Sequence, residues 1–166
     1  MSRRVSRKIV LLRHAQTAGK QAGQRDYERI LTPEGEEQCR KTRQQFIRNS
    51  FLPNFILSSA ALRAQHTARL VSEGFAIPDS NQQYLDTLYE ADGDTWMRYL
   101  RQLPPHVNEV LCVGHNPILS WLASHLSGQP KDLAPCGFIL LETTASSWMD
   151  FPTGIHEVFS LPHPHP

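Results

Sequence analysis

Three short apolar runs, each followed at once by polar residues, limit most strongly the folds open to this chain. The runs are residues 9–12, 55–57 and 110–113. A continuous apolar run of this length is typical of a strand buried on both faces, as in the parallel sheets of α/β proteins. Parallel strands need long crossover connections that are usually helices, so the runs predict an α/β protein with helices between the strands.

Helical patterns occupy the stretches between these runs. Thr32 followed by Pro33 is typical of a helix N-cap and first helical residue, and Asn116 followed by Pro117 repeats the pattern. Apolar residues recur at helical spacing in two further stretches. Residues 76–83 contain proline, aspartate and asparagine and are expected to form a loop.

Two more strands are predicted near the C-terminus, at residues 138–141 and at residues 155–161, the second at an edge of the sheet. The alternation of strands and helices predicts a three-layer α/β/α sandwich with a mainly parallel central sheet. We expect a single domain over residues 8–161. A basic N-terminal extension at residues 1–7 would precede it, and a flexible tail at residues 162–166 would follow.

The net charge and the shortness of the apolar stretches narrow the possible partners. The chain of 166 residues has a formal charge of +1, which gives no reason to expect nucleic acid or a membrane surface as a partner. No apolar stretch approaches the length of a membrane span or of the apolar part of a signal peptide. Three widely spaced cysteines, Cys39, Cys112 and Cys136, fit buried thiols in a reducing compartment. We expect a cytoplasmic monomer.

Polar residues with chemical potential stand directly after each of the three apolar runs. They are Arg13 and His14 after the first run, Ser58, Ser59 and Arg63 after the second, and Gly114, His115 and Asn116 after the third. Ligands of open parallel sheets bind outside the carboxyl ends of the strands. If the three strands are neighbours, two arginines and two histidines converge on one cleft.

Such a set suits phosphoryl transfer. Guanidinium groups hold phosphate through paired, charge-assisted hydrogen bonds. Amides at the starts of the helices after Ser59 and Asn116 would add donors for the same anion. A neutral imidazole is a competent nucleophile, and fixed positive neighbours stabilise the transition state. The pattern lacks an acid-rich magnesium set, so we expect neither a metal nor another cofactor.

Four motifs of this chain resemble those of the histidine phosphatase (phosphoglycerate mutase-like) superfamily. In chain order they are "LLRHAQT", "LTPEGEEQC", "LSSAALRAQHTARLV" and "VLCVGHNPILSWLA", and together they cover about residues 8–142. The short length of the chain and the "GHNP" spelling are most similar to the SixA-type phosphohistidine phosphatase branch. One departure is Ala15, which stands where the superfamily usually has glycine.

The resemblance implies a role for each residue of the converging set. His14 would be the nucleophile and would carry a transient phosphohistidine. Arg13, Arg63 and His115 would hold the phosphoryl oxygens of the substrate.

Further residues are expected around the bound phosphate. Thr17 matches a threonine of the family's first loop, Arg29 stands where the branch often has an arginine that reaches the pocket, and Asn116 follows the second histidine. Glu90 is the nearest candidate for the general acid that larger relatives use to protonate a leaving oxygen. A solvated loop carboxylate is the alternative interpretation of Glu90, because the labile P–N bond of phosphohistidine needs less help from an acid.

These inferences predict a metal-independent hydrolase of phosphate monoesters or phosphoramidates, with a phosphorylated protein as the leading substrate. A phosphomonoesterase for a small phosphorylated metabolite, such as a sugar or nucleotide phosphate, is the alternative among enzymes. A non-catalytic phosphate-binding module would need no nucleophile. A zinc hydrolase using His14, His115 and Cys136 would lack the short ligand spacing of such sites. We expect activity to fall below about pH 5.5–6, where an ordinary histidine takes up a proton.

Overall fold

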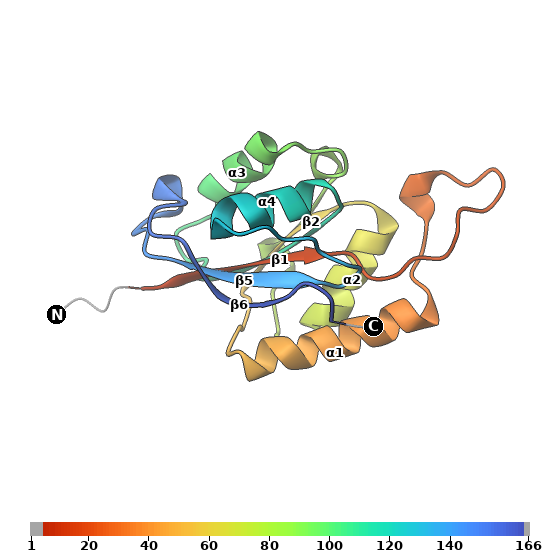
Figure 1. Cartoon of the computed structure of the whole chain (residues 1–166), viewed down its shortest axis with the longest axis horizontal. Helices are drawn as coiled ribbons and strands as arrows, with labels where there is room; N and C mark the ends of the chain where they lie inside the picture. The colour runs from red at the N-terminus through yellow and green to blue at the C-terminus, as the bar shows by residue number, and fades with distance from the viewer. Residues whose placement is uncertain (1–4, 165–166) are drawn as a thin grey trace.

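A computed structural model describes residues 5–164, in which one central sheet separates two pairs of helices (Figure 1). The strands are β1 (Arg7–Arg13), β2 (Phe55–Ser59), β3 (Gln82–Leu85), β4 (Glu109–Gly114), β5 (Phe138–Thr143) and β6 (His156–Leu161). The α-helices are α1 (Pro33–Arg48), α2 (Leu62–Ser72), α3 (Gly93–Arg101) and α4 (Ile118–Ser127). Helices α1 and α2 cover one face of the sheet and α3 and α4 the other, so the predicted three-layer sandwich is confirmed.

The order of the strands across the sheet is β3-β2-β4-β1-β5-β6. Strands β1 to β4 run parallel to one another, whereas β5 is antiparallel to β1 and β6 is antiparallel to β5. The sheet is therefore mainly parallel, and β6 lies at an edge as predicted. Arg13 of β1 pairs with Gly114 of β4, so the ends of the two central strands lie side by side.

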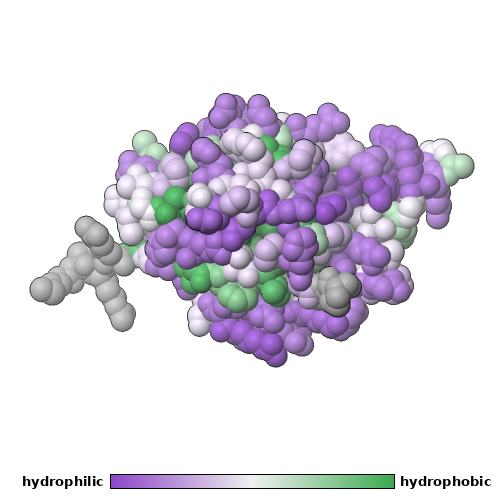
Figure 2. Space-filling model, viewed as in Figure 1, coloured by the Kyte–Doolittle hydropathy of each residue, from purple (hydrophilic) through white to green (hydrophobic). Residues whose placement is uncertain are grey.

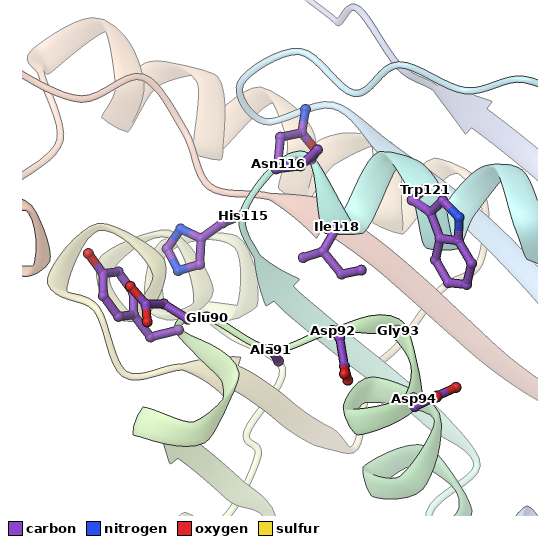
Figure 3. Close-up of a pocket in the computed structure, with 11 residues that line it drawn as sticks. Glu90, Ala91, Asp92, Gly93, Asp94, His115, Asn116, Ile118 and Trp121 are labelled. Atoms are coloured by element: carbon purple, nitrogen blue, oxygen red, sulfur yellow. The ribbon is translucent and has the colours of Figure 1, made fainter.

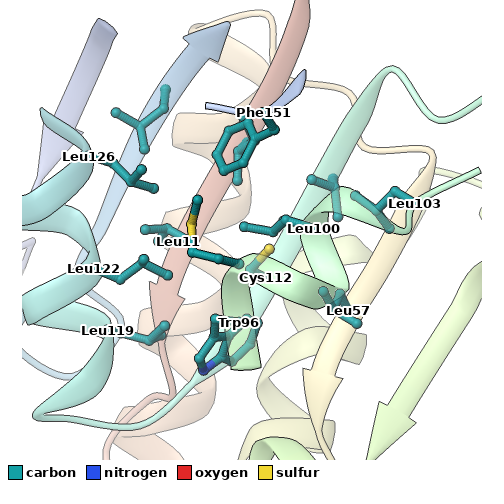
Figure 4. Packing of buried hydrophobic residues seen from close by; sticks show 14 of the residues in the cluster. Leu11, Leu57, Trp96, Leu100, Leu103, Cys112, Leu119, Leu122, Leu126 and Phe151 are labelled. Atoms are coloured by element: carbon teal, nitrogen blue, oxygen red, sulfur yellow. The ribbon is translucent and has the colours of Figure 1, made fainter. Parts of the chain in front are cut away.

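Alternate residues of the central strands enter two separate hydrophobic cores. Ile9 and Leu11 of β1 pack with α3 and α4, whereas Val10 and Leu12 pack with α1 and α2. Figure 4 shows the first core, in which Leu11 lies among side chains of both helices, including Trp96 of α3. Burial on both faces explains why this strand has a continuous apolar run, and it fixes the point at which the next residue emerges.

The start of α1 agrees with the sequence. Thr32 is the N-cap, because its Oγ1 accepts a hydrogen bond from the Gly35 amide at 3.0 Å. Gly35 also permits the helix to pack closely on the loop after β1. A Cβ at this position would lie 2.3 Å from the carbonyl oxygen of Gln16.

The start of α4 differs from the prediction by one residue. The helix begins at Ile118, and Pro117 rather than Asn116 holds the N-cap position. The Asn116 side chain still serves the first turn, since its Oδ1 accepts from the Ser120 hydroxyl at 2.8 Å. Its Nδ2 donates to the carbonyl of Leu133 at 2.8 Å, so the side chain ties α4 to the loop before β5.

One strand is missed by the sequence pattern. Residues 76–83 are predicted to be a loop, but Gln82 and Gln83 open the edge strand β3, which pairs only with β2. Its side chains are half-buried or exposed, because no strand covers its outer side. An edge strand of this kind has no apolar run to reveal it.

The division of the chain into extension, domain and tail stays a prediction, and the structure adjusts its boundaries. Strand β1 begins at Arg7, whose buried guanidinium donates to a backbone carbonyl at 3.0 Å, so Arg7 belongs to the sheet. Pro162 accepts a hydrogen bond from the Ala134 amide at 2.8 Å, which ties the start of the expected tail to the fold. Residues 1–4 and 165–166, the outer parts of the two terminal segments, lie outside the described part.

The surface gives little sign of a large apolar patch. Figure 2 shows a face on which hydrophilic residues predominate and hydrophobic residues form small groups. The large hydrophobic residues that are exposed come from separate parts of the chain: Val5, Ile30, Ile47, Leu52, Leu62, Trp121, Met149 and Val158. Within residues 5–164, no helix combines the length and the hydropathy that a membrane span requires.

Candidate active site

The carboxyl ends of β1, β2 and β4 bring the predicted residues together. The His14 amide donates to the carbonyl of Gly114 at 3.0 Å, which places the residues after β1 and β4 next to each other. The ring centroids of His14 and His115 are consequently 5.3 Å apart. Arg63, in the first turn of α2 after β2, places its Nε 3.3 Å from Nε2 of His14. The predicted convergence of strand ends is therefore present in the structure.

His14 is held as a neutral imidazole whose unprotonated nitrogen faces Arg63. Its Nδ1 lies 2.8 Å from the carbonyl oxygen of Ala15, which assigns the ring proton to Nδ1. Nε2 then carries the lone pair and accepts from Arg63. Burial, reinforced by the neighbouring His115 and Arg63, lowers the pKa of His14 to about 3. A histidine with this pKa is unprotonated and nucleophilic at neutral pH.

The backbone behind the nucleophile is fixed by Thr67 of α2. The Thr67 hydroxyl accepts a hydrogen bond from the Ala15 amide at 3.0 Å and donates to the Arg63 carbonyl at 2.7 Å. Ala15 itself is completely buried in the core under α1 and α2. The methyl group that replaces the superfamily's usual glycine therefore packs into the interior, away from the phosphate side of the loop.

Arg63 is buried and makes two hydrogen bonds to Asp26. Its Nη1 donates to the Asp26 carbonyl at 2.7 Å, and its Nη2 donates to the Asp26 carboxylate at 2.8 Å. The Arg63 side chain is only 7% exposed, whereas that of Asp26 is 43% exposed. The guanidinium also lies over the ring of Tyr89, at 5.8 Å from its centroid. A phosphate that enters the site meets this arginine already oriented beside the nucleophile.

One ring nitrogen of His115 has no hydrogen-bond partner among the described residues. Its Nε2 lies 2.8 Å from the hydroxyl of Ser59, which in turn accepts from the Ala61 amide. Among the described residues the Ser59 hydroxyl meets no other acceptor, which favours donation to Nε2 and a proton on Nδ1 of His115. That Nδ1 is buried without a partner. Burial, then the charge of Arg63, lowers the pKa of His115 to about 4, so a neutral imidazole offers this N–H to an anion.

Arg13 and Asn116 share one acceptor at the far side of the cluster. Arg13 Nη1 donates to the carbonyl of Leu133 at 3.0 Å, and Asn116 Nδ2 donates to the same oxygen at 2.8 Å. Arg13 is half-buried, and burial lowers the pKa of its guanidinium. The contacts of Asn116 hold the loop before β5, whereas Nε of Arg13 is buried without a partner among the described residues, and the contact of Arg13 with phosphate stays a prediction.

The loop after His14 carries the other two predicted phosphate ligands. Thr17 Oγ1 accepts from Nη2 of Arg29, and Nε of Arg29 donates to the carbonyl of Ala18 at 3.2 Å. Arg29 Nη1 donates to the Asp26 carboxylate at 3.1 Å. Thr17 and Arg29 therefore contact each other rather than His14, and their contact with phosphate stays a prediction. Figure 1 shows this segment projecting beyond the strand ends.

Sequence reasoning missed Asp26 and Tyr89, which link the loop to the strand ends. Asp26 accepts from Arg63, Arg29 and the Tyr89 hydroxyl, the last at 2.7 Å. These hydrogen bonds, led by that of Tyr89, hold the pKa of Asp26 well below its usual range. The spacing of Asp26 and Arg29, three residues apart, was the one available signal, and it does not identify Arg63 as a partner.

Glu90 lines a cavity of about 760 Å³ that His115 also lines (Figure 3). The cavity is lined by Tyr89, Glu90, Ala91, Asp92, Gly93, Asp94, His115, Asn116, Pro117, Ile118 and Trp121. Glu90 is exposed, and the ring of the preceding Tyr89 packs edge-on against His115 at a centroid distance of 5.5 Å. The carboxylate is therefore close to the place where a leaving group would depart, and its role as an acid stays a prediction.

The cysteines do not form part of the cluster. Cys39, Cys112 and Cys136 are free thiols in the interior, and the Sγ atoms of Cys39 and Cys136 lie 4.0 Å apart. Burial raises the pKa of Cys112, and contact with Cys136 raises that of Cys39. Over the described residues, His, Cys, Asp and Glu side chains form no group of three or more with the geometry of a metal site.

Comparison with known families identifies this arrangement. The sequence model of the "Histidine phosphatase superfamily (branch 1)" matches residues 9–103, which span β1 to the end of α3 and include Arg13, His14 and Arg63. The chain belongs to the histidine phosphatase superfamily. A curated relative, an uncharacterized chloroplastic protein of Arabidopsis thaliana, is 30% identical over 171 residues, covering 96% of this chain and 74% of that protein.

Two solved structures of phosphatases share the fold. The putative phosphohistidine phosphatase SixA from Nakamurella multipartitia superposes with a TM-score of 0.81 at 24% identity, covering 97% of this chain and 96% of that chain. A putative alpha-ribazole-5'-P phosphatase from Escherichia coli has a TM-score of 0.65 at 20% identity, covering 85% and 93%. Family and site together make this chain a phosphatase.

Proposed function

We propose that this histidine phosphatase removes phosphate from phosphohistidine in a protein, through a covalent intermediate on His14 and without a metal ion. The observation that carries the proposal is the state of His14. One ring nitrogen is tied to the Ala15 carbonyl, and the other presents its lone pair beside Arg63. A neutral nucleophile next to a fixed guanidinium is the equipment that transfer of a phosphoryl group requires.

In the first step, Nε2 of His14 attacks phosphorus. The bond from phosphorus to Nε2 forms as the bond from phosphorus to the leaving group breaks, and the leaving group departs with the bonding electrons and takes up a proton. The hydrogen bond from Nδ1 to the Ala15 carbonyl stabilises the positive charge that develops on the imidazole. Arg13, Arg63 and the Nδ1–H of His115 stabilise the negative phosphoryl oxygens.

In the second step, water attacks the phosphorus of the phosphohistidine. The bond from phosphorus to oxygen forms, the bond to Nε2 breaks, and His14 leaves as a neutral imidazole while inorganic phosphate carries away the proton of the water. Each step needs the same positive cluster, because the transferring group keeps its charge throughout.

The SixA-type assignment rests on overall similarity and on the leaving group. The fold superposes on a putative SixA over nearly the whole of both chains. Glu90 is exposed and offers only weak acid assistance, which suits the labile P–N bond of phosphohistidine better than an alkyl ester. Thr17, Arg29 and Asn116 would complete the phosphate site once a ligand is bound. The free thiols support a reducing compartment such as the cytoplasm.

A small-molecule phosphomonoesterase is the second candidate. The cavity of about 760 Å³ beside His115 is large enough for a metabolite. The fold also superposes on a putative alpha-ribazole-5'-P phosphatase. A pure binding module is disfavoured, because binding alone would not require a nucleophile with a pKa of about 3.

A substrate panel tests the proposal. Peptides and a phosphorelay protein carrying phosphohistidine are compared with sugar, nucleotide and aryl phosphates, with kcat/KM as the measurement. We expect the phosphohistidine substrates to be preferred by at least about tenfold, and preference for one small ester would establish the alternative. Glu90→Gln sharpens the result: it should slow an alkyl ester more than a phosphoramidate, and equal, large losses on both would contradict the role of the labile bond.

A further inference from the structure

The cavity beside His115 has chemistry of its own that the phosphate site does not use. One of its walls is apolar and aromatic, formed by Pro117, Ile118 and Trp121 at the start of α4. The facing wall, formed by the segment before α3 and the first turn of α3, carries Glu90 and Asp94; Figure 3 shows Asp94 on α3 opposite Trp121, and Glu90 nearer to His115. No lysine or arginine lines the cavity within the described part of the chain.

The carboxylates of this wall are free to meet a ligand. Asp92 is committed, since its side chain accepts from the Thr95 amide at 2.8 Å as the N-cap of α3. Glu90 and Asp94, by contrast, make no side-chain hydrogen bond and no ion pair with any described residue. No described cation forms an ion pair with either carboxylate, and the adjoining His115 is neutral at pH 7 because its pKa is about 4.

The aromatic wall is held in place by contacts that cover part of Trp121. The indole stacks on the His125 ring, with centroids 5.0 Å apart and planes inclined by 6°. Its six-membered ring also rests against Gly93, where an added Cβ would lie 2.3 Å from Cζ3 of the indole. Trp121 remains 50% exposed, so part of its aromatic surface is held in place on the wall that faces Glu90 and Asp94.

His115 connects this cavity to the reacting atoms. It is 8% exposed, its Nδ1 has no partner among the described residues, and it lines the cavity while its ring centroid lies 5.3 Å from that of His14. A phosphoryl group bound to His115 would therefore extend its leaving group between Trp121 and Asp94. We propose that the cavity is the leaving-group subsite and that it selects phosphate compounds whose leaving group carries a positive charge on a flat or apolar body.

The physical reason is complementarity of charge and surface. A cation over an indole face gains from the ring quadrupole, and two unpaired carboxylates add attraction at short range. The imidazole of phosphohistidine, which is cationic once protonated, belongs to this class. So do quaternary ammonium esters. The inference rests on the phosphate site of the proposed function and adds the charge and shape of the leaving group.

The test uses two phosphate esters that differ only in charge. Phosphocholine and 3,3-dimethylbutyl phosphate have nearly the same shape, with a quaternary nitrogen in the first and a carbon in the second. Dissociation constants are measured by calorimetry on the full-length His14→Asn chain, which cannot turn the ligands over, with inorganic phosphate as the reference. We expect phosphocholine to bind at least about fivefold more tightly than the neutral ester.

Variants locate the effect in the cavity. Asp94→Asn and Trp121→Leu should each reduce the preference toward one without changing the affinity for inorganic phosphate. Asp79→Asn is the matched control, because Asp79 is an exposed carboxylate just before the start of β3 and does not line the cavity. This variant should keep the preference for phosphocholine. Equal binding of the two esters, or a preference that survives both cavity variants, would overturn the inference. If the His14→Asn chain does not bind inorganic phosphate at all, the phosphate site of the proposed function is overturned as well. Failure of the subsite alone is thereby distinguished from failure of the proposed function.

Discussion

The strand-end cluster and the loop after β1 approach the same phosphate site in different ways. His14 and His115 stand at the ends of buried strands, and Arg63 follows such a strand in the first turn of a helix. Asp26 and Arg29 come from a segment that projects beyond the sheet. The Arg63 side chain is 7% exposed and that of Arg29 is 27% exposed. The cluster is thus fixed by the core, whereas the loop is fixed by its contacts with the cluster.

This difference explains which residues can act without help from the substrate. The nucleophile, its neighbouring arginine and the second histidine are oriented before phosphate arrives, as electrostatic catalysis requires. In the loop, Arg29 donates hydrogen bonds to Asp26 and to the loop backbone, and Asp26 accepts one from Arg63. They are accordingly expected to tune phosphate binding rather than to determine whether the reaction occurs.

The largest contrast is expected between two equivalent arginine substitutions. Arg63→Lys should lower kcat/KM by about 100- to 1,000-fold, because an ammonium cannot replace the fixed fork beside His14. Arg29→Lys should lower it by about tenfold or less, since about 1.4 kcal/mol of binding is at stake. Steady-state kinetics on one substrate measure both. Equal losses would show that the loop and the cluster are not distinct.

Asp26→Asn tests the contact that joins the two regions. The substitution keeps the shape of the side chain but removes the anion that occupies Arg63. We expect inorganic phosphate to inhibit more strongly, because it no longer competes with a carboxylate, and kcat to fall by about tenfold as Arg63 loses its orientation. Weaker inhibition by phosphate with an unchanged kcat would contradict this account.

The stability of the folded chain should fall on acidification because of the two histidines of the cluster. Their pKa values are about 3 for His14 and about 4 for His115. An unfolded histidine titrates near 6.5, so between about pH 6.5 and 4 the unfolded chain takes up protons that the folded chain refuses. Denaturant unfolding should show a free energy that declines over this interval and is independent of these groups above it.

A variant of His14 isolates the contribution of this residue to the pH dependence of stability. The pH dependence of unfolding should be shallower in His14→Asn, and an unchanged slope would contradict the assigned pKa.

The pKa of about 3 also places protonation of His14 in the free enzyme well below the pH 5.5–6 expected from an ordinary histidine. The acid limb of kcat/KM, with the ionisation of the substrate allowed for, should therefore lie near pH 3–4, where His14 and His115 take up protons.

The smallest effect on activity is expected at Asn116. Its side chain joins α4 to the loop before β5 through Ser120 and Leu133. Asn116→Ala should reduce the free energy of unfolding by about 1–2 kcal/mol and change kcat/KM by less than about threefold. A large loss of phosphate affinity with unchanged stability would instead restore Asn116 as a direct phosphate ligand.

The sequence predicts the cluster because its position follows from burial. Apolar runs predict strands, parallel strands end at one edge, and the residues after them must meet there. This reasoning predicts the positions of Arg13, His14, Arg63 and His115. It does not predict those of Asp26 and Tyr89, since their places depend on how an irregular loop folds back over α2. The sequence also missed strand β3 and the exact start of α4. An exposed edge strand lacks a continuous apolar run, and one residue at a helix start does not change the helical spacing of the apolar residues.

Transfer of phosphate to His14 is the central claim, and trapping the intermediate tests it most directly. The wild-type chain is mixed with a 32P-labelled phosphohistidine peptide, quenched in alkali and digested, and the labelled fragment is identified by mass spectrometry. We expect label on His14 that is stable in alkali and labile in acid, and no label on His14→Asn. Label that survives acid, or that persists on His14→Asn, would contradict the account.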